Sequence, residues 1–260
     1  MLGILGIGKI GGLLAKKLTE NNYINKKDML LCVRRIEKKK EYEELGFKVT
    51  MDLNTLLLKS DTIILAVKPQ NIEELKPYIV KIDFKDKCII STLASISIDY
   101  ISSIFKNASV YRVMPNIAME YNMSNTTISF YDPKYLRRVE EMFQFLGKTY
   151  IVKEVEMNYL TPLNGSMTAF LALFAKDFID ETKKIGLSYD FVKSIVLESI
   201  ISSATLMLNS NRSIEDLIKE VCSKGGITIA GVTELYKNGF DEAIKACYEA
   251  CRLRNKELSK

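Results

Sequence analysis

Three glycines near the start of the chain stand at a spacing that suits phosphate binding. The segment reads Gly6-Ile7-Gly8-Lys9-Ile10-Gly11, and it follows an apolar run and opens an amphipathic one. In this pattern the first glycine permits a tight turn, the second lets a pyrophosphate approach the backbone, and the third allows close packing of helix on strand. The N-terminus of that helix supplies free N–H groups and a partial positive charge. The sequence therefore predicts that this segment binds a dinucleotide.

Two arginines after the next apolar run indicate which dinucleotide is preferred. An NAD site usually places Asp or Glu after the second strand, where the carboxylate binds the ribose 2′-hydroxyl. Here that strand continues into Arg34 and Arg35, and Glu37 is the nearest acid downstream. Guanidinium groups suit the additional negative charge of a 2′-phosphate. We therefore predict NADPH as the cofactor, with NADH also usable; the alternative is an ordinary solvated basic surface.

Further candidate cofactor residues follow later apolar runs, at the carboxyl ends where open α/β sheets bind ligands. They are Ala66, Val67, Lys68 and Pro69 after one run, Ala94 and Ser95 after another, and Asn116 after a third. We expect Lys68 to contact a ribose or phosphate, or else simply to begin a loop. Ser95 is expected near the nicotinamide, and Asn116 is expected to bond the nicotinamide side or to hold its loop.

A second glycine-rich turn is a candidate site for a carboxylate. Gly225, Gly226, Ile227 and Thr228 precede a helix, and glycine lets backbone N–H groups converge on an anion. The Thr228 hydroxyl can both donate and accept a hydrogen bond. The alternative is a glycine break in which Thr228 caps the helix.

An absence bounds the chemistry, because the 260 residues include no His. This excludes triads with a His base, HExxH zinc sites and facial His/carboxylate iron sites. The five cysteines include no CxxC and are interpreted as buried free thiols in a reducing compartment. We expect no metal, and any proton transfer near neutral pH must use another group or water. The net charge of +5 suits an anionic ligand and does not predict nucleic-acid binding.

The elements that must position these residues change character near residue 153. Before it, apolar runs alternate with amphipathic ones, which predicts a Rossmann-type doubly wound α/β sheet over 1–153. The expected strands are 2–6, 29–33, 48–51, 62–67, 88–91, 109–113, 126–131 and 149–152. The expected helices between them are 9–20, 36–45, 53–59, 71–79, 98–105 and 133–146.

After residue 153 the pattern predicts an all-α dimerisation domain, 154–260. Its expected helices are 155–187, 190–208, 213–221 and 226–257, the last broken at 238–239. The apolar surface of these helices predicts a homodimer. The first residues lack the basic region of a signal peptide, and no uncharged apolar run approaches about 20 residues. We therefore expect a cytoplasmic protein without membrane contact.

Several segments together resemble pyrroline-5-carboxylate reductases. They are GIGKIG at 6–11, AVKPQ at 66–70, VYRVMPN at 110–116, SKGGITIAG at 223–231 and the tail NGFDEAIKACYEACRLRNKEL. The resemblance spans essentially the whole chain. It implies an NAD(P)-binding domain and a helical domain that forms a homodimer, often assembled into a higher homo-oligomer. It also implies NADPH-dependent reduction of 1-pyrroline-5-carboxylate to L-proline, the last step of proline biosynthesis.

The resemblance also implies roles for residues of the second half. Thr228 is expected to be the catalytic residue that bonds the ring nitrogen of the cyclic imino acid, and the 225–228 amides are expected to hold its carboxylate. Ser223 and Met167 complete the expected substrate site. A cyclic imine can take its proton from solvent while the cofactor carries the hydride, which fits a chain without His.

Departures from the family pattern bear on the substrate. The chain has MPNIA at 114–118 where the family has MPNTP, NGSMTAF at 164–170 for SGSGPAY, and SKGGIT at 223–228 for SPGGTT. Ser95 replaces a usual glycine. Two alternatives therefore stay open: a paralogue that reduces another cyclic imino acid, and a non-catalytic NADP-binding regulator. A β-hydroxyacid dehydrogenase is disfavoured because GSMTAFLALFA lacks the expected catalytic Lys.

Overall fold

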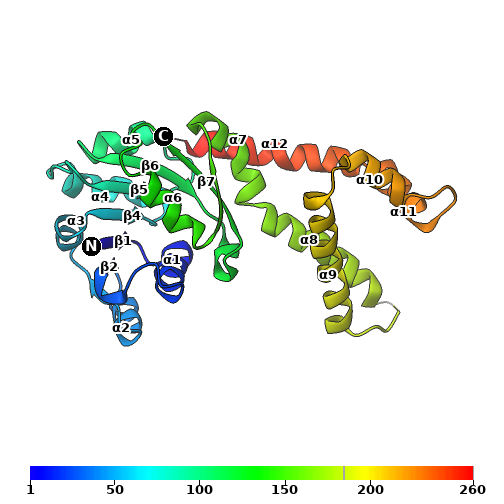
Figure 1. Ribbon diagram of the computed structural model, residues 1–260, viewed down its shortest axis with the longest axis horizontal. Coiled ribbons are helices and arrows are strands. Elements are labelled where there is room, and N and C mark those ends of the chain that lie inside the picture. The colour runs from blue at the N-terminus through cyan, green and yellow to red at the C-terminus, as the bar shows by residue number, and fades with distance from the viewer. Residues whose placement is uncertain (184, 260) are drawn as a thin grey trace. The chain divides into compact units, whose positions relative to one another are not determined.

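A computed structural model describes residues 1–183 and 185–259 (Figure 1). Contacts divide the chain into two compact units. The sheet unit comprises Met1–Ser166 and the C-terminal residues from Cys251 onward, and the helical unit comprises Met167–Ala250. The domain boundary between 153 and 154 stays a prediction. The contacts themselves divide the chain after Ser166 and again before Cys251.

The sheet unit is built on one sheet whose strands follow the order β3-β2-β1-β4-β5-β6-β7-β8. The strands are β1 (Leu2–Leu5), β2 (Met29–Cys32), β3 (Lys48–Thr50), β4 (Thr62–Leu65), β5 (Cys88–Ser91), β6 (Ser109–Met114), β7 (Ser124–Phe130) and β8 (Gly147–Ile151). Neighbours run parallel except β6 and β7, which are antiparallel. The strand order reverses between β1 and β4, and such a switch point opens a crevice at the carboxyl ends of the strands. The predicted doubly wound, mostly parallel sheet is confirmed.

Helices cover both faces of this sheet. They are α1 (Lys9–Glu20), α2 (Ile36–Glu44), α3 (Leu53–Lys59), α4 (Ile72–Ile79), α5 (Ile98–Ile104) and α6 (Leu136–Gln144). Within the described residues, the 3₁₀ turns η1 (Lys26–Asp28), η2 (Pro69–Asn71) and η3 (Ile117–Tyr121) were not predicted.

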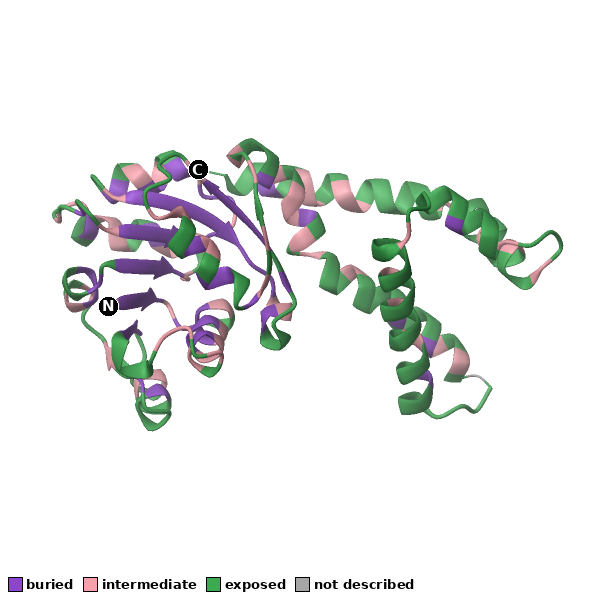
Figure 2. Cartoon of the chain, viewed as in Figure 1, coloured by how far each residue is buried: buried purple, intermediate pink, exposed green. Residues whose placement is uncertain are grey.

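Alternate strand residues supply two separate apolar cores, since successive side chains of a strand point to opposite faces. Ile4 packs with α1 and α6 in one core, whereas Leu5 packs with α3, α4 and α5 in the other. Figure 2 shows the strands buried along most of their length. The fully buried strands β1, β2, β4 and β5 therefore read as mostly apolar runs in the sequence, whereas β3 and β8 are partly exposed and do not.

The remaining helices come after the last strand in the chain. They are α7 (Glu154–Asn164), α8 (Met167–Lys183), α9 (Tyr189–Asn209), α10 (Ile214–Val221), α11 (Ile227–Lys237) and α12 (Phe240–Leu258). The predicted break at 238–239 is confirmed.

The prediction of one continuous helix over 155–187 is wrong, because α7 ends at Asn164 and α8 begins at Met167; residue 184 lies outside the described residues. Asn164 is held by the sheet instead. Its Nδ2 donates to the Met114 carbonyl at 3.0 Å, and its own carbonyl accepts from Asn116 Nδ2 at 2.8 Å. These bonds join the end of α7 to the carboxyl end of β6.

A buried ion pair ties the start of α7 to the centre of the sheet. The Arg112 side chain on β6 is 3% exposed, and its Nη1 lies 3.2 Å from Glu154 Oε1. Glu154 also accepts from the Ile98 amide at 2.7 Å and from the Tyr131 hydroxyl at 3.0 Å. Burial lowers the pKa of Arg112 although Glu154 opposes the shift. Removing one partner of such a pair leaves a buried charge that is poorly compensated.

We expect Arg112→Met to lower the free energy of unfolding by about 3 kcal/mol, because Glu154 loses its buried counter-charge. Urea unfolding followed by circular dichroism measures the change. The control is Arg137→Met, whose pair with Glu141 is largely exposed and should cost at most about 0.5 kcal/mol. Equal effects of the two substitutions would contradict this role of the buried pair.

Candidate functional site

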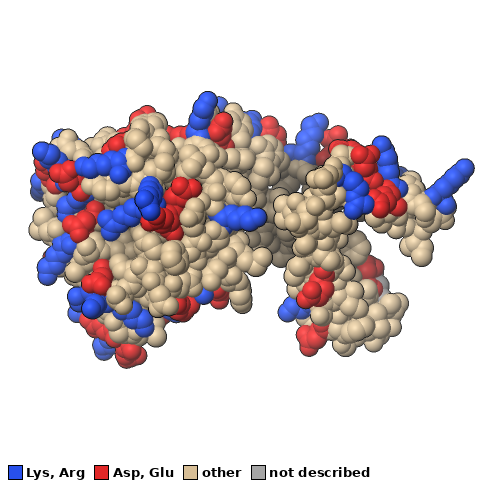
Figure 3. All heavy atoms as spheres, in the orientation of Figure 1, with Lys and Arg blue, Asp and Glu red and all other residues tan. Residues whose placement is uncertain are grey.

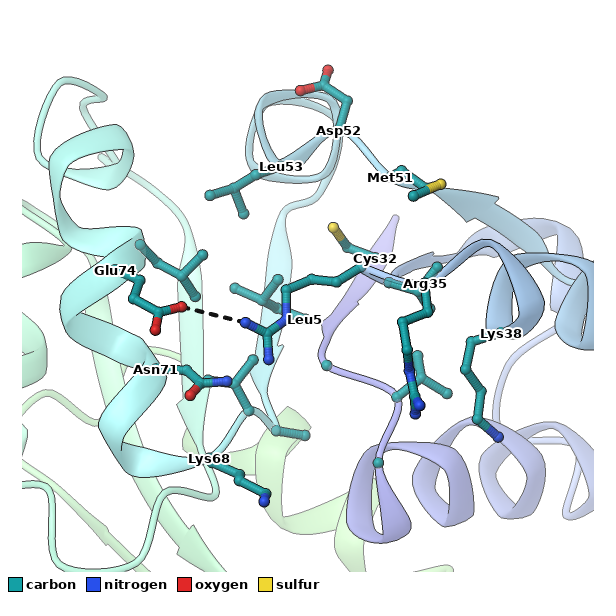
Figure 4. Close-up of a pocket in the computed structure, with 18 of the residues that line it drawn as sticks. Leu5, Cys32, Arg35, Lys38, Met51, Asp52, Leu53, Lys68, Asn71 and Glu74 are labelled. Carbon is teal, nitrogen blue, oxygen red and sulfur yellow. Dashed lines mark hydrogen bonds and ion pairs between the residues drawn. The ribbon is translucent and has the colours of Figure 1, made fainter.

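A cavity of about 810 Å³ opens at the carboxyl ends of β1, β2 and β4 (Figure 4). It is lined by residues 5–8, 32–35 and 66–68 from these strand ends. Lys38 of α2, residues 51–54 before and at the start of α3, and one side of α4 complete the lining. The structure thus brings together eight predicted cofactor residues: Gly6, Ile7, Gly8, Arg34, Arg35, Ala66, Val67 and Lys68.

The three glycines of the first turn are needed for different reasons, because a Cβ would meet different surroundings at each of them. Gly6 has φ +96°, and a Cβ there would lie 2.9 Å from the Ala66 carbonyl oxygen. A Cβ on Gly11 would lie 2.0 Å from the Gly6 oxygen. A Cβ on Gly8 would meet nothing within 4 Å. Packing within the protein therefore requires the first and third glycines, whereas the second leaves its backbone open beside the cavity.

The N-terminus of α1 is the positive end of an uncompensated dipole. Gly8 is the N-cap residue, so no side chain caps the helix, and the first turn contains no acidic residue. The first N–H groups of a helix have no partner within the helix, and together with its dipole they favour an anion. Ile7 is buried and Ile10 packs against the core. Lys9, Ile10 and Gly11 therefore belong to the helix rather than to the cavity lining.

Four basic side chains line the cavity: Arg34, Arg35, Lys38 and Lys68. The lining also includes two acidic residues that the sequence pattern does not predict there, Asp52 and Glu74. Arg34 Nη1 lies 3.3 Å from Glu74 Oε2, whereas Lys38 pairs with Glu41 at 2.7 Å. The only sequence signal for Glu74 is that α4 follows the end of β4 after a short 3₁₀ turn. Its first turns therefore border the same sheet edge.

Asp52 is committed to the backbone of α3. It is the N-cap residue, and its carboxylate accepts from the amides of Asn54 and Thr55. A hydrogen bond from the Thr55 hydroxyl lowers the pKa of Asp52 most, and the two amides add to the effect. The Asp52 carboxylate therefore stabilises a helix start.

None of the five cysteines forms a disulfide. Only two of the five, Cys32 and Cys88, are buried. The expectation that all five are buried is wrong for Cys222, Cys247 and Cys251, which lie on or beside helices outside the sheet core and are partly exposed. Burial raises the pKa of Cys32, which lines the cavity, to about 11. Its thiol is therefore protonated and unreactive at neutral pH.

The remaining predicted cofactor residues of the sheet unit do not line the cavity. They are Pro69, Ala94, Ser95 and Asn116. Ser95 is 3% exposed at φ +66°, and its hydroxyl donates to Asn255 Oδ1 of α12. Asn116 accepts from the Ala118 amide at 3.0 Å and donates to the Asn164 carbonyl, so it holds its own loop. Their contact with a cofactor stays a prediction.

The predicted substrate residues lie in the helical unit. Gly225 has φ +73°, Gly226 is the N-cap residue of α11, and Thr228 is exposed in the first turn of this helix. The alternative in which Thr228 caps α11 is therefore wrong. Ser223 accepts from the Gly226 amide at 3.0 Å through its carbonyl. Met167 is the first residue of α8.

Two protein-family models match separate parts of the chain. The model "NADP oxidoreductase coenzyme F420-dependent" matches residues 1–95. The model "Pyrroline-5-carboxylate reductase dimerisation" matches residues 154–258.

Relatives and solved structures match over nearly the full length. A pyrroline-5-carboxylate reductase of Staphylococcus epidermidis is 30% identical over 98% of this chain and 96% of its own. Pyrroline-5-carboxylate reductase 2 of Bacillus subtilis is 28% identical over 99% and 94%.

The 1-pyrroline-5-carboxylate reductase of Streptococcus pyogenes superposes with a TM-score of 0.89 at 26% identity, covering 98% of both chains. The Plasmodium falciparum pyrroline carboxylate reductase with NADP bound also has a TM-score of 0.89, at 24% identity over 100% and 98%. The predicted fold class and family resemblance are confirmed. This chain belongs to the pyrroline-5-carboxylate reductase family.

Proposed function

We propose that this protein uses NADPH to reduce the C=N bond of 1-pyrroline-5-carboxylate to L-proline, the last step of proline biosynthesis. One observation carries the proposal. The cavity joins an open glycine turn to Arg34 and Arg35, in a chain whose relatives are named pyrroline-5-carboxylate reductases.

The cavity fits the cofactor at both phosphate positions. The open backbone at Gly8 and the free N–H groups of α1 suit a pyrophosphate. Arg34 and Arg35, at the end of β2, suit the 2′-phosphate. When bound, NADPH supplies the hydride.

The glycine turn before α11 and the first turn of this helix supply groups that can bind the imino acid. Its first turn has no acidic residue and no side-chain cap, so its N–H groups can receive the substrate carboxylate. The positive φ of Gly225 curves the backbone towards this helix start. The Thr228 hydroxyl is the group that donates a hydrogen bond to, or accepts one from, the ring nitrogen. The proton on the nitrogen would come from water, or from this hydroxyl with water restoring its proton.

The helical unit supports a homodimer. Phe178, Phe191 and Ile201, each more than half exposed, lie on α8 and α9. Few charged side chains interrupt the surface of these helices in Figure 3. Exposed apolar surface of this extent marks an interface, and the family model matched here is a dimerisation model. Assembly beyond the dimer is a further expectation of the same surface.

One described helix, α9, is long and apolar enough to cross a membrane, with 6% of its apolar window buried. Charged residues lie within this helix, so it does not contradict the expectation that no uncharged apolar run approaches about 20 residues. The charges on Asp190, Lys193 and Glu198 and the dimerisation match favour contact with a second copy over contact with lipid. A cytoplasmic location is in keeping with five cysteines that form no disulfide.

The purified protein should oxidise NADPH when given 1-pyrroline-5-carboxylate, and the decay of absorbance at 340 nm measures this. We expect kcat/KM for NADPH to exceed that for NADH about tenfold, as charge-assisted bonds to the 2′-phosphate allow. The six-membered cyclic imino acid serves as the comparison substrate. Preference for that substrate would favour the paralogue, binding without turnover would favour the regulator, and equal use of NADH would contradict the coenzyme preference.

We expect Gly8→Ala to raise the Kd for NADPH at least about tenfold, because its methyl group would occupy the space where the pyrophosphate approaches. Its Tm without cofactor should stay nearly unchanged, since nothing in the protein lies within 4 Å of that methyl group. Fluorescence titration and thermal unfolding measure the two effects. Gly11→Ala is the contrasting variant and should destabilise the fold itself, because its Cβ would lie 2.0 Å from a carbonyl oxygen. Unaltered NADPH binding by Gly8→Ala would argue against this cofactor position.

We expect Thr228→Ala to lower kcat/KM about a hundredfold, as loss of a proton-transfer group does, with little change in Tm because the side chain is exposed. Steady-state kinetics and thermal unfolding measure both. Thr233→Ala, on the same helix, removes a hydroxyl that bonds only the Ile229 carbonyl and should keep full activity. A fully active Thr228→Ala variant, or one that fails to fold, would contradict the assigned role.

A further inference from the structure

Only one of the two acidic residues that line the cavity turns towards its arginines. In Figure 4 a dashed line joins Glu74 of α4 to a guanidinium, which is that of Arg34, while the Asp52 carboxylate points away from the cavity. Glu74 lies 40 positions after Arg34 in the chain, so the pair joins two separate walls of the cavity. Asp52 is occupied by the N-terminal amides of α3.

The Arg34–Glu74 pair is weak enough to be exchanged. It consists of one contact of 3.3 Å, and the two side chains are 72% and 67% exposed. Ion pairs of this exposure contribute little to stability. The guanidinium offers five donors, and within the described residues only its Nη1 is engaged by an acidic side chain.

A phosphate that binds Arg34 must share or replace the Glu74 carboxylate. The 2′-phosphate carries close to two negative charges, so a carboxylate at the same guanidinium repels it. A free 2′-hydroxyl carries no charge and meets no such repulsion. The cost of Glu74 therefore falls on NADPH much more than on NADH.

We propose that Glu74 is a specificity-determining residue, whose carboxylate competes with the 2′-phosphate of NADPH for Arg34 and so limits the preference for NADPH over NADH. This rests on the proposed function in that the cavity binds the dinucleotide. Arg35 extends into the cavity from the same loop and has no acidic partner among the described residues. It therefore supplies the part of the phosphate attraction that Glu74 does not oppose.

The opposite role for Glu74 would be to orient Arg34 for the phosphate. A carboxylate that orients a guanidinium usually holds it by a bidentate contact. The single contact between exposed side chains favours competition. The two roles predict opposite signs when the charge is removed.

The test is Glu74→Gln in the full-length protein. Binding of adenosine 2′,5′-bisphosphate, 5′-AMP, NADPH and NADH is measured by calorimetry at low salt, without imino acid. We expect the bisphosphate and NADPH to bind about threefold more tightly, which lies within the range of exposed ion pairs, and 5′-AMP and NADH to change less than about 1.5-fold. The difference should shrink at 0.5 M salt, because screening weakens both the pair and the repulsion.

Two further variants sharpen the test. Glu73→Gln removes the same charge one residue earlier, where the carboxylate accepts a hydrogen bond from Tyr100 outside the cavity, and should leave the NADPH to NADH affinity ratio unchanged. In an Arg34→Gln background, Glu74→Gln should give no gain in bisphosphate affinity, because the competition acts through Arg34.

Several outcomes would overturn the proposal. They are weaker binding of NADPH by Glu74→Gln, equal gains for NADH and NADPH, an equal gain from Glu73→Gln, or a wild-type protein that does not bind the bisphosphate. Because binding is measured without turnover, failure to reduce 1-pyrroline-5-carboxylate would reject the proposed function and leave this inference standing.

Discussion

The close contact between the backbone of α1 and the turn after β1 is the constraint on which the rest of the site depends. No side chain fits at Gly11, because the Gly6 carbonyl oxygen lies where its Cβ would be. Backbone bonds hold the same turn to both neighbouring strands, from the Gly6 amide to the Cys32 carbonyl at 3.1 Å and from the Ala66 amide to the Leu5 carbonyl at 2.9 Å. These contacts aim the N-terminus of α1 into the crevice between the strand ends. The anion site is therefore a property of the backbone.

Side chains then adjust a site that the backbone has already built. Arg34 and Arg35 add positive charge beside the helix terminus, and Glu74 removes part of it from across the cavity. Asp52 lies in the same lining, but its carboxylate accepts hydrogen bonds from the amides of α3 and does not compete for the arginines. The two carboxylates thus have different roles, because that of Asp52 is bonded to the amides of α3, whereas that of Glu74 has one contact with an exposed guanidinium.

The region beyond β5 is held by polar bonds that reach across the sequence. Ser95 bonds Asn255, and Asn255 in turn donates to the Asn158 carbonyl at 3.3 Å. Asn158 accepts from Arg112, which also pairs with Glu154. The end of α12 and the start of α7 are thereby connected to the loop that follows a central strand. This explains how Ser95 keeps a positive φ that would suit glycine better.

The sequence by itself determined the features that depend on local pattern. Apolar runs and helical spacing predicted the strands, most helices and the doubly wound sheet, and the glycine turn with Arg34 and Arg35 predicted most of the cavity's strand-end lining. Only the tertiary structure decided the break after Asn164, the partner of Ser95 and the presence of Glu74 opposite Arg34. The reason is physical. Periodicity and turn chemistry act between near neighbours, whereas these contacts join residues that only the packing of helices on the sheet brings within hydrogen-bond distance.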